Sequence, residues 1–285
     1  MRRLWGDRRG AFGIAVLSLA VLLALAAPLV TSGAPAEQRD VVGTRFLPPL
    51  ATDRYHAFHP LGTDRFGRDV WTRVVYGARI SLTVSGLAVL LSVLVGVAVG
   101  GAAGYAAGGV GTLLLGVTDF ALALPRVVLL LLLAALWPPN AALVIVVLGL
   151  TGWMTIARLV HGEVRSLAAR PFVEGASALG AGRARILGRH ILPNALTPVI
   201  VAAALGVGNA VLLEAGLSFL GLGVQPPAPS WGNMIASGRD SLVNAPWVAA
   251  APGIALAVVV VACTLLGDAI RDAYHRDVGH ATWDV

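Results

Sequence analysis

The sequence has no lysine, one cysteine and few charged residues, and each shortage excludes a class of function. The 21 lysine or arginine positions are all arginine. Because a Walker A loop needs a lysine that reaches the nucleotide phosphates, the chain has no ordinary ATP-binding loop. Charged residues make up 13% of the chain, whereas soluble domains average roughly 25%. With 57% hydrophobic residues, the composition predicts an all-α protein embedded in a lipid bilayer.

Cysteine and histidine are too sparse for a disulfide framework or an obvious metal centre. Cys263 lies inside the last apolar run, where a packed and unreactive thiol is the simplest interpretation. His56 and His59 have no further histidine or cysteine close in sequence, so we predict no metal site there. Asp64 and Asp69 indicate turn and ion-pair chemistry more simply than a cation site. The arginines expected to pair with these carboxylates are Arg65, Arg68 and Arg73.

Long apolar stretches predict a polytopic membrane protein, since a helical span needs about 20 predominantly apolar residues. The segment 80–118 carries no charge and is too long for one span at about 1.5 Å per residue. The glycine-rich run 100–111 divides it into two. Paired prolines at 138–139 cannot continue a helix and predict a turn. The six predicted transmembrane helices are residues 11–30, 80–99, 112–136, 141–157, 195–213 and 247–266.

The first apolar run has two interpretations, a cleaved secretory signal or a retained membrane anchor. A secretory signal has an apolar core of about 7–15 residues, whereas the uncharged run here covers residues 11–30. The sequence R-R-G-A-F at 8–12 is also similar to a twin-arginine signal, but further spans follow it. We therefore predict a retained anchor.

Arginines cluster beside three of the predicted span ends, and their placement predicts the orientation of the chain. Basic residues accumulate on the cytoplasmic side of membrane proteins. Six spans place the three clusters on one side, which we predict to be cytoplasmic, together with both termini. The loop 32–78 disagrees because it also contains arginines, but it is long and its acids partly balance them. The clusters are Arg2, Arg3, Arg8 and Arg9; Arg158, Arg165, Arg170, Arg183, Arg185 and Arg189; and Arg271 and Arg276.

These spans divide the chain into an anchor, a long outer loop and a helical core. The core is expected to hold five of the six helices and a basic cytoplasmic loop. The predicted parts are a cytoplasmic N-terminus (1–10), the anchor (11–31), an extracytoplasmic loop (32–78), the core (79–271) with its cytoplasmic loop (158–194), and a cytoplasmic tail (272–285).

The stretch R-P-F-V-E-G-A-S-A-L-G, residues 170–180, predicts a short helix outside the membrane. Pro171 suits the first helical position, where its missing N–H is not needed. Gly180 suits the residue after the helix, which adopts left-handed geometry. A helix of this length does not persist alone in water. Phe172, Ala176 and Leu179 share one apolar face, which could enter a groove of a partner or lie on lipid headgroups; the residues alone favour neither.

The pattern E-G-A-x-x-x-G, followed after nine residues by H-I-L-P, resembles the EAA loop of membrane subunits of bacterial ABC importers. In that family the loop is a coupling helix that docks into a cytoplasmic ATPase. Gly175 departs from the second position of the family pattern, and His190 stands where many members have isoleucine. The form R-H-I-L-P-N is usual in the peptide-importer branch. The resemblance implies that the ATPase-coupling residues are Pro171, Phe172, Glu174, Ala176, Leu179, Gly180, Leu192 and Pro193.

Three further segments, 59–82, 214–235 and 265–272, resemble the second membrane subunit of dipeptide and oligopeptide importers. The resemblance implies the type I permease fold of ABC importers in the bacterial cytoplasmic (inner) membrane. It also implies a homologous second permease subunit, two cytoplasmic ATPase subunits that hold ATP and Mg²⁺, and an extracytoplasmic substrate-binding protein. By the same resemblance this chain performs no covalent chemistry, and binds no cofactor, metal or nucleic acid itself.

Two other functions remain open at this stage. Nickel importers share the same architecture, so a metal chelate is an alternative cargo. An ion-coupled secondary transporter would have inverted repeats and ionisable residues near the midplane; no repeat is visible, and Asp119 and Arg126 are the only candidates for such residues. A membrane enzyme is disfavoured because the sequence has no His, Asp and Glu cluster.

Asp119 and Arg126 lie within the predicted third span, where a charge costs roughly 2.5–3.5 kcal/mol on insertion scales. They are seven residues apart, nearly on one face of a continuous helix but about 10 Å apart along its axis. Pro125 between them frees a carbonyl group and permits a bend. We predict a structural role for Asp119 near the cytoplasmic end. For Arg126 our hypothesis is that it faces the translocation pathway and meets a peptide carboxylate.

The remaining charges near span ends have simple interpretations. Glu214 is expected at headgroup level, at the outer end of the fifth span, with no special role. Asp268, Arg271 and Asp272 predict a solvated ion-pair cluster that closes the last helix.

Overall fold

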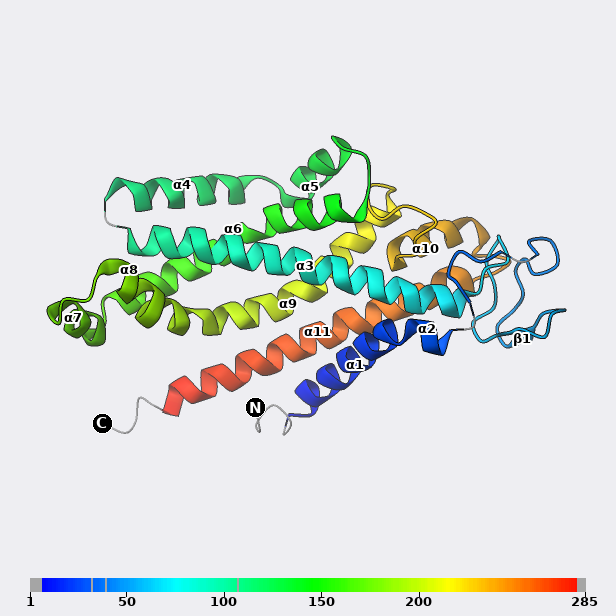
Figure 1. Ribbon diagram of the computed structural model, residues 1–285, viewed down its shortest axis with the longest axis horizontal. Coiled ribbons are helices and arrows are strands. Elements are labelled where there is room, and N and C mark those ends of the chain that lie inside the picture. Colours follow the sequence, from blue (N-terminus) through cyan, green and yellow to red (C-terminus); the bar gives the residue numbers. More distant parts are fainter. Residues whose placement is uncertain (1–6, 32, 39, 107, 281–285) are drawn as a thin grey trace.

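The computed structural model describes residues 7–280 except 32, 39 and 107, and side chains up to residue 273. The predicted tail residue Arg276, like Arg2 and Arg3, therefore has no described side chain. The chain forms an elongated bundle whose long helices run along one axis (Figure 1). The helices are α1 (Arg8–Leu25), α2 (Ala27–Val30), α3 (Val70–Tyr105), α4 (Gly109–Ala123), α5 (Arg126–Ala135), α6 (Ala141–Ala168), α7 (Pro171–Ala178), α8 (Arg183–Ile186), α9 (Leu192–Phe219), α10 (Trp231–Gly238) and α11 (Trp247–His280).

The two ends of the bundle differ in what they hold (Figure 1). Helices α7 and α8 lie at one extremity, which we call the α7 end. The long segment before α3 and helix α10 lie at the other, which we call the loop end. A small antiparallel sheet at the loop end joins β1 (Ala51–Thr52) to β2 (Phe58–His59). The mostly helical architecture confirms the predicted fold class, although an all-α description omits this sheet.

Five helical segments of the described chain are long and apolar enough to cross a membrane on their own. Helices α4 and α5 pass the same test only as a pair, bent by 86°. The prediction of six spans therefore holds if this bent pair counts as one crossing. The prediction of a continuous third span, 112–136, is wrong.

The bend follows from Pro125. The residue before a proline is pushed out of helical geometry, and Leu124 is extended, with φ −76° and ψ 134°. Pro125 is itself extended and also lacks the N–H that would continue the ladder. The helix therefore stops at Ala123 and restarts at Arg126 in a new direction.

The helices of four other predicted spans extend beyond the predicted limits, because charged residues and glycines near the span ends continue the helix. Asp69 caps α3 by accepting a hydrogen bond from the Thr72 amide at 2.7 Å, so α3 begins ten residues before the predicted limit. It also continues through Gly100 to Tyr105, and the predicted break shrinks to the residues around Gly108 (φ +76°). Helix α6 likewise runs eleven residues past its predicted end.

The first predicted span, 11–30, is interrupted near its end. Helix α1 stops at Leu25, and the Ala26 amide closes it by donating a hydrogen bond to the Leu22 carbonyl. Pro28 then lies in the first turn of the separate helix α2. Helix α1 packs along α11: a Cβ on Gly13 would lie 2.8 Å from the Ala262 carbonyl oxygen.

Glycines bring α3 and α6 almost into backbone contact. A Cβ on Gly96 would lie 2.6 Å from the Ile156 Cβ, and one on Gly104 would lie 2.9 Å from the Val164 Cβ. A Cβ on Gly100, between them, would collide with the Ala157 carbonyl. Larger residues at these positions would force the helices apart, so this stripe of α3 depends on having no side chains.

One minor prediction about α11 is confirmed: Cys263 is buried against Gly208 of α9 as a packed thiol. The ion-pair cluster expected from Asp268, Arg271 and Asp272 is found only in part. Arg271 pairs with Asp268 at 3.0 Å, but the pair does not close α11, which continues to His280.

Candidate functional site

Helix α7 is limited by local sequence signals, as predicted. Pro171 occupies its first turn, and Gly180 follows it with φ +81°. The Gly180 amide donates to the Ser177 carbonyl at 3.0 Å, and the Ala181 amide donates to the Ala176 carbonyl at 3.1 Å. This pair of bonds is the Schellman motif, which satisfies the last carbonyls of a helix.

The side chains of α7 divide between the protein and the outside. Val173 is buried in a cluster with Ile186 and Ile191, and Ala176 packs at the edge of that cluster. Phe172 is 43% exposed and Leu179 is 91% exposed. The apolar face predicted for α7 is therefore divided: Ala176 helps to fix the helix to the chain, while Phe172 and Leu179 point outward.

The rest of the predicted coupling segment surrounds α7. Glu174 is exposed and, with Arg183, lines an open hollow beside α7. Gly182 precedes α8 and gives it no side-chain cap, and a π-helical turn (Leu187–Ile191) leads into α9. Leu192 and Pro193 form the first turn of α9, with Leu192 half-buried and Pro193 exposed.

A cavity of about 230 Å³ lies between the middle parts of α3, α6 and α9. Arg126, the first residue of α5, reaches into its wall, and its Nε atom is buried without a hydrogen-bond partner in the described structure. Asp119 lies elsewhere and pairs with Arg158 at 3.6 Å, with both side chains exposed. The expectation that Asp119 and Arg126 share one helix face is wrong, because the bend at Pro125 separates them.

Glu214 is the largest correction among the single residues. Instead of contacting water or headgroups, its side chain is fully buried within the chain. Its carboxylate accepts hydrogen bonds of 2.7 Å from the hydroxyls of Ser81 and Ser218. The Ser81 hydroxyl also accepts the Trp231 amide, and the Ser218 hydroxyl accepts the amide of Val224. The carboxylate thus joins α3 and α9 to the segment that folds back as α10.

The sequence contained one signal for this network. Ser218 stands four residues after Glu214, which places both on one face of a helix. The part of Ser81 could not be inferred, because Ser81 lies 133 residues before Glu214 and 150 residues before Trp231, the two residues that it joins.

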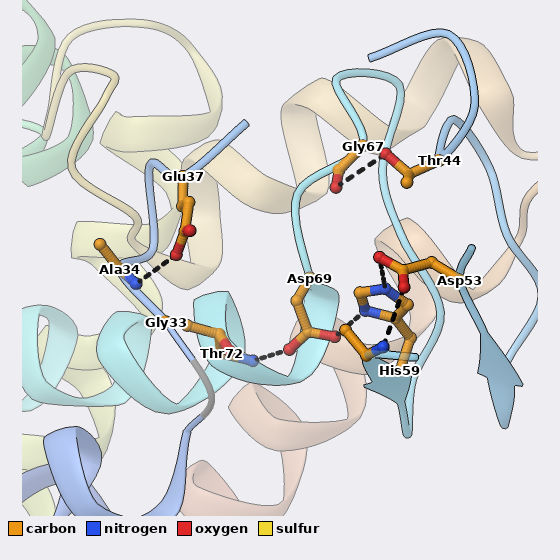
Figure 2. Close-up of a pocket in the computed structure, with 10 residues that line it drawn as sticks. Gly33, Ala34, Glu37, Thr44, Asp53, His59, Gly67, Asp69 and Thr72 are labelled. Carbon is orange, nitrogen blue, oxygen red and sulfur yellow. Dashed lines mark hydrogen bonds and ion pairs between the residues drawn. The ribbon is translucent and has the colours of Figure 1, made fainter. Parts of the chain in front are cut away.

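A second polar pocket lies at the loop end, where Figure 2 shows His59 between two carboxylates. The His59 Nδ1 lies 2.9 Å from Asp69 and its Nε2 lies 3.6 Å from Asp53. Partial burial favours the neutral acid, but hydrogen bonds from the Ala57 and Tyr55 amides, with His59 nearby, hold the pKa of Asp53 below its usual value. Among the residues the structure describes, no group of three His, Cys, Asp or Glu is arranged to hold a metal ion.

Asp64 makes the ion pairs expected of it. Its carboxylate lies 2.7 Å from Arg68 and 3.8 Å from Arg73. Arg65 departs from the expectation, since its guanidinium stacks on the Phe66 ring at 4.6 Å.

Comparison with known proteins identifies the family. A sequence model of the protein family described as the inner membrane component of binding-protein-dependent transport systems matches residues 79–280. The match runs from within α3 to the end of α11. The chain belongs to this family. It is thus a multi-pass membrane component of such a transport system, and the match includes the transmembrane cavity, α7 and the Glu214 network.

Relatives of this inner membrane component cover nearly the whole chain. A putative peptide transport system permease protein of Brucella abortus is 39% identical over 95% of this chain and 88% of its own length. The dipeptide transport system permease protein DppC of Alkalihalophilus pseudofirmus is 37% identical over 92% of this chain and 83% of its own. A di/tripeptide transport system permease protein of Pseudomonas aeruginosa is 37% identical over 94% and 88%.

Proposed function

We propose that the chain is a permease subunit of an ATP-driven ABC importer that moves di- or oligopeptides across the bacterial cytoplasmic membrane. The observation that supports the cargo most directly is the likeness to peptide, dipeptide and di/tripeptide permeases over more than nine-tenths of the chain. In this proposal a homologous second permease completes the pathway, and an extracytoplasmic binding protein delivers the peptide to the loop end.

The α7 end is proposed as the docking surface for a cytoplasmic ATPase, one of two such subunits that bind ATP and Mg²⁺ in the importer. Phe172 and Leu179 offer an apolar contact, since both point outward from a helix that Val173 holds in place. Glu174 adds a charge beside them. Exposed apolar side chains of this size favour burial against a protein partner. This arrangement supports the groove-docking interpretation of α7 over the headgroup interpretation.

The other proposed coupling residues transmit the contact. Pro171 and Gly180 fix the two ends of α7, and Ala176 seats it on the cluster beneath. Leu192 and Pro193 start α9, the helix that forms one wall of the cavity. Movement of α7 would thus be passed to α9. Both termini and the α7 end face the cytoplasm in this proposal.

A charge reversal on α7 tests the proposal. Glu174→Arg is expected to lower ATP-dependent peptide uptake about tenfold or more in vesicles that contain all subunits, because it places a like charge beside Arg183 and alters the docking surface. ATPase co-purification should fall with uptake. Asp240→Arg, an equal reversal of an exposed acid at the loop end, is the matched control and should retain ATPase binding.

Three outcomes would contradict parts of the proposal. Uptake by Glu174→Arg at the normal rate without bound ATPase would remove the coupling role of α7. Uptake that stops when the proton gradient is collapsed, with ATP maintained, would favour an ion-coupled transporter. Uptake of nickel in place of peptides would favour the metal-chelate alternative.

A further inference from the structure

The guanidinium of Arg126 occupies a place where an arginine needs a partner. It enters the cavity near the middle of three long helices, beside Ser92 of α3 and Gly152 of α6. Its Nη2 lies 3.4 Å from the point that a Cβ on Gly152 would occupy, so a glycine there leaves room for the charged group. Charged groups at this depth normally face a water-filled cavity or a counter-charge.

The chain itself supplies no counter-charge in the part that the structure describes. The residues that line the cavity include no Asp or Glu, and the nearest acid along the chain, Asp119, is paired with Arg158. The Ser92 hydroxyl is directed at the Ala88 and Gly149 carbonyls, to which it donates at 3.0 Å, and it makes no hydrogen bond with Arg126 in the described structure. The Nε of Arg126 is buried without a partner.

The remaining walls suit a ligand that ends in an anion. Thr155 and Asn209 line the cavity, are exposed in this chain, and make no side-chain hydrogen bond within the described residues. Both can donate to an anion. Apart from Ser92, the other lining residues are small or apolar and leave open space around these three polar groups.

We propose that this cavity binds the carboxylate of the transported peptide, with Arg126 as its charged ligand and Thr155 and Asn209 as neutral donors. A guanidinium binds a carboxylate through two parallel hydrogen bonds, which gives both strength and orientation. The inference rests on the proposed peptide cargo and names the part of the cargo that this chain recognises. A cavity of about 230 Å³ holds the end of a peptide, not an entire oligopeptide.

The test compares peptides that differ only in their carboxylates. The complete importer is reconstituted with a tripeptide, its C-terminal amide, and the same amide with one Glu side chain. The three peptides are chosen so that the binding protein binds them equally, measured separately. Wild type should take up both carboxylate-bearing peptides faster than the plain amide if any carboxylate suffices. It should favour only the free acid if the C-terminus is the recognised group.

Arg126→Gln is expected to slow uptake of the preferred acid about 10- to 100-fold, since it removes a charge-assisted bidentate contact. Uptake of the plain amide should change less than about twofold. Asn209→Ala should reduce the acid-to-amide ratio by a smaller factor, about two- to fivefold, through loss of one neutral hydrogen bond. This second variant keeps the proposal testable if Arg126→Gln does not assemble.

Chemical replacement of the charge gives an independent readout. Arg126→Cys in a Cys263→Ala background should lose the preference for the acid, and an aminoethyl thiol reagent, which restores a positive charge, should return it. A hydroxyethyl reagent of similar size should not. An unchanged acid-to-amide ratio in Arg126→Gln and Asn209→Ala would overturn the inference while leaving peptide transport intact. The inference would also be overturned if Arg126→Gln lowered uptake of the acid and of the amide equally and the second permease no longer co-purified. That result would make Arg126 an ion-pair partner between subunits. Failure of wild type to take up any peptide would instead overturn the proposed function.

Discussion

The two ends of the bundle differ in which side chains they bury and which they expose. At the loop end polar groups are buried and bonded within the chain: Glu214 and Thr63 are fully buried, and Ser230 caps α10 through a reciprocal pair of bonds with Asn233. At the α7 end Leu179 is 91% exposed, and Gly182, the residue before α8, provides no side-chain cap. The loop end thus holds these polar groups in bonds within the chain, whereas the α7 end carries the segment proposed to contact an ATPase. Stability and coupling should therefore respond to mutation at different ends.

The largest effect on stability is expected from Glu214→Ala. This change leaves two buried hydroxyls without their acceptor and a cavity where the carboxylate was, at a cost of about 3 kcal/mol. The midpoint of thermal unfolding in detergent should fall clearly.

Glu174→Ala at the α7 end provides the matched comparison. Because Glu174 is exposed, its removal should alter the free energy of unfolding by less than about 0.5 kcal/mol. Equal unfolding midpoints for the two variants would show that the buried network does not stabilise the loop end.

An intermediate effect, on the local stability of the loop around Asp53, is expected to depend on pH. The pKa of Asp53 is lowered in the fold, so its contribution is fully present above the unfolded value of 3.8 and is lost as the pH falls through the lower folded value. Hydrogen exchange at the Tyr55 and Ala57 amides should be protected at neutral pH and lose protection only below about pH 4. Asp53→Asn should reduce the protection by about 1 kcal/mol at neutral pH.

The corresponding control keeps the loop and removes an unrelated charge. Asp240→Asn changes an exposed acid whose ion-pair partner in the described structure is Arg239, and it should leave exchange at both amides unchanged. Loss of protection already between pH 7 and pH 5 would contradict the assignment to Asp53.

The smallest effect on stability is expected from Phe172→Ser. The ring is 43% exposed, so the free energy of unfolding should change by less than about 1 kcal/mol. Peptide uptake should nevertheless fall several-fold if this ring contacts an ATPase. A change in unfolding as large as that of Glu214→Ala would place Phe172 among the residues that hold the fold.

Local signals predicted the α7 end better than the rest of the molecule. Pro171 and Gly180 act within one turn of α7, so their positions in sequence were enough to place its ends. Pro125 was recognised as a possible bend, but the angle and the separation of Asp119 from Arg126 depend on how α4 and α5 pack against other helices. The polar cavity was not foreseen, since its walls come from segments far apart in the chain.

Glu214 shows why burial was the hardest property to predict. Its place near the end of a predicted span suggested contact with water or headgroups. Helix α10 instead packs near the end of α9 and encloses Glu214. Trp231 and Asn233 of α10 are buried in this contact region. That return of the chain is set by tertiary contacts that no local period reveals.

The glycine stripe between α3 and α6 has a mechanical consequence. Helices that meet through interlocking side chains can shift along each other when those side chains change rotamer. At the glycine stripe α3 and α6 lie so close that no such rotamer change is available. Helices α3 and α6 should therefore move together as one rigid body, roughly 50 Å long at the usual rise per residue. Helix α6 ends three residues before the start of α7, and α3 starts at the loop end. A small displacement of α7 would therefore tilt the α3–α6 pair and move the loop end, with little deformation in between.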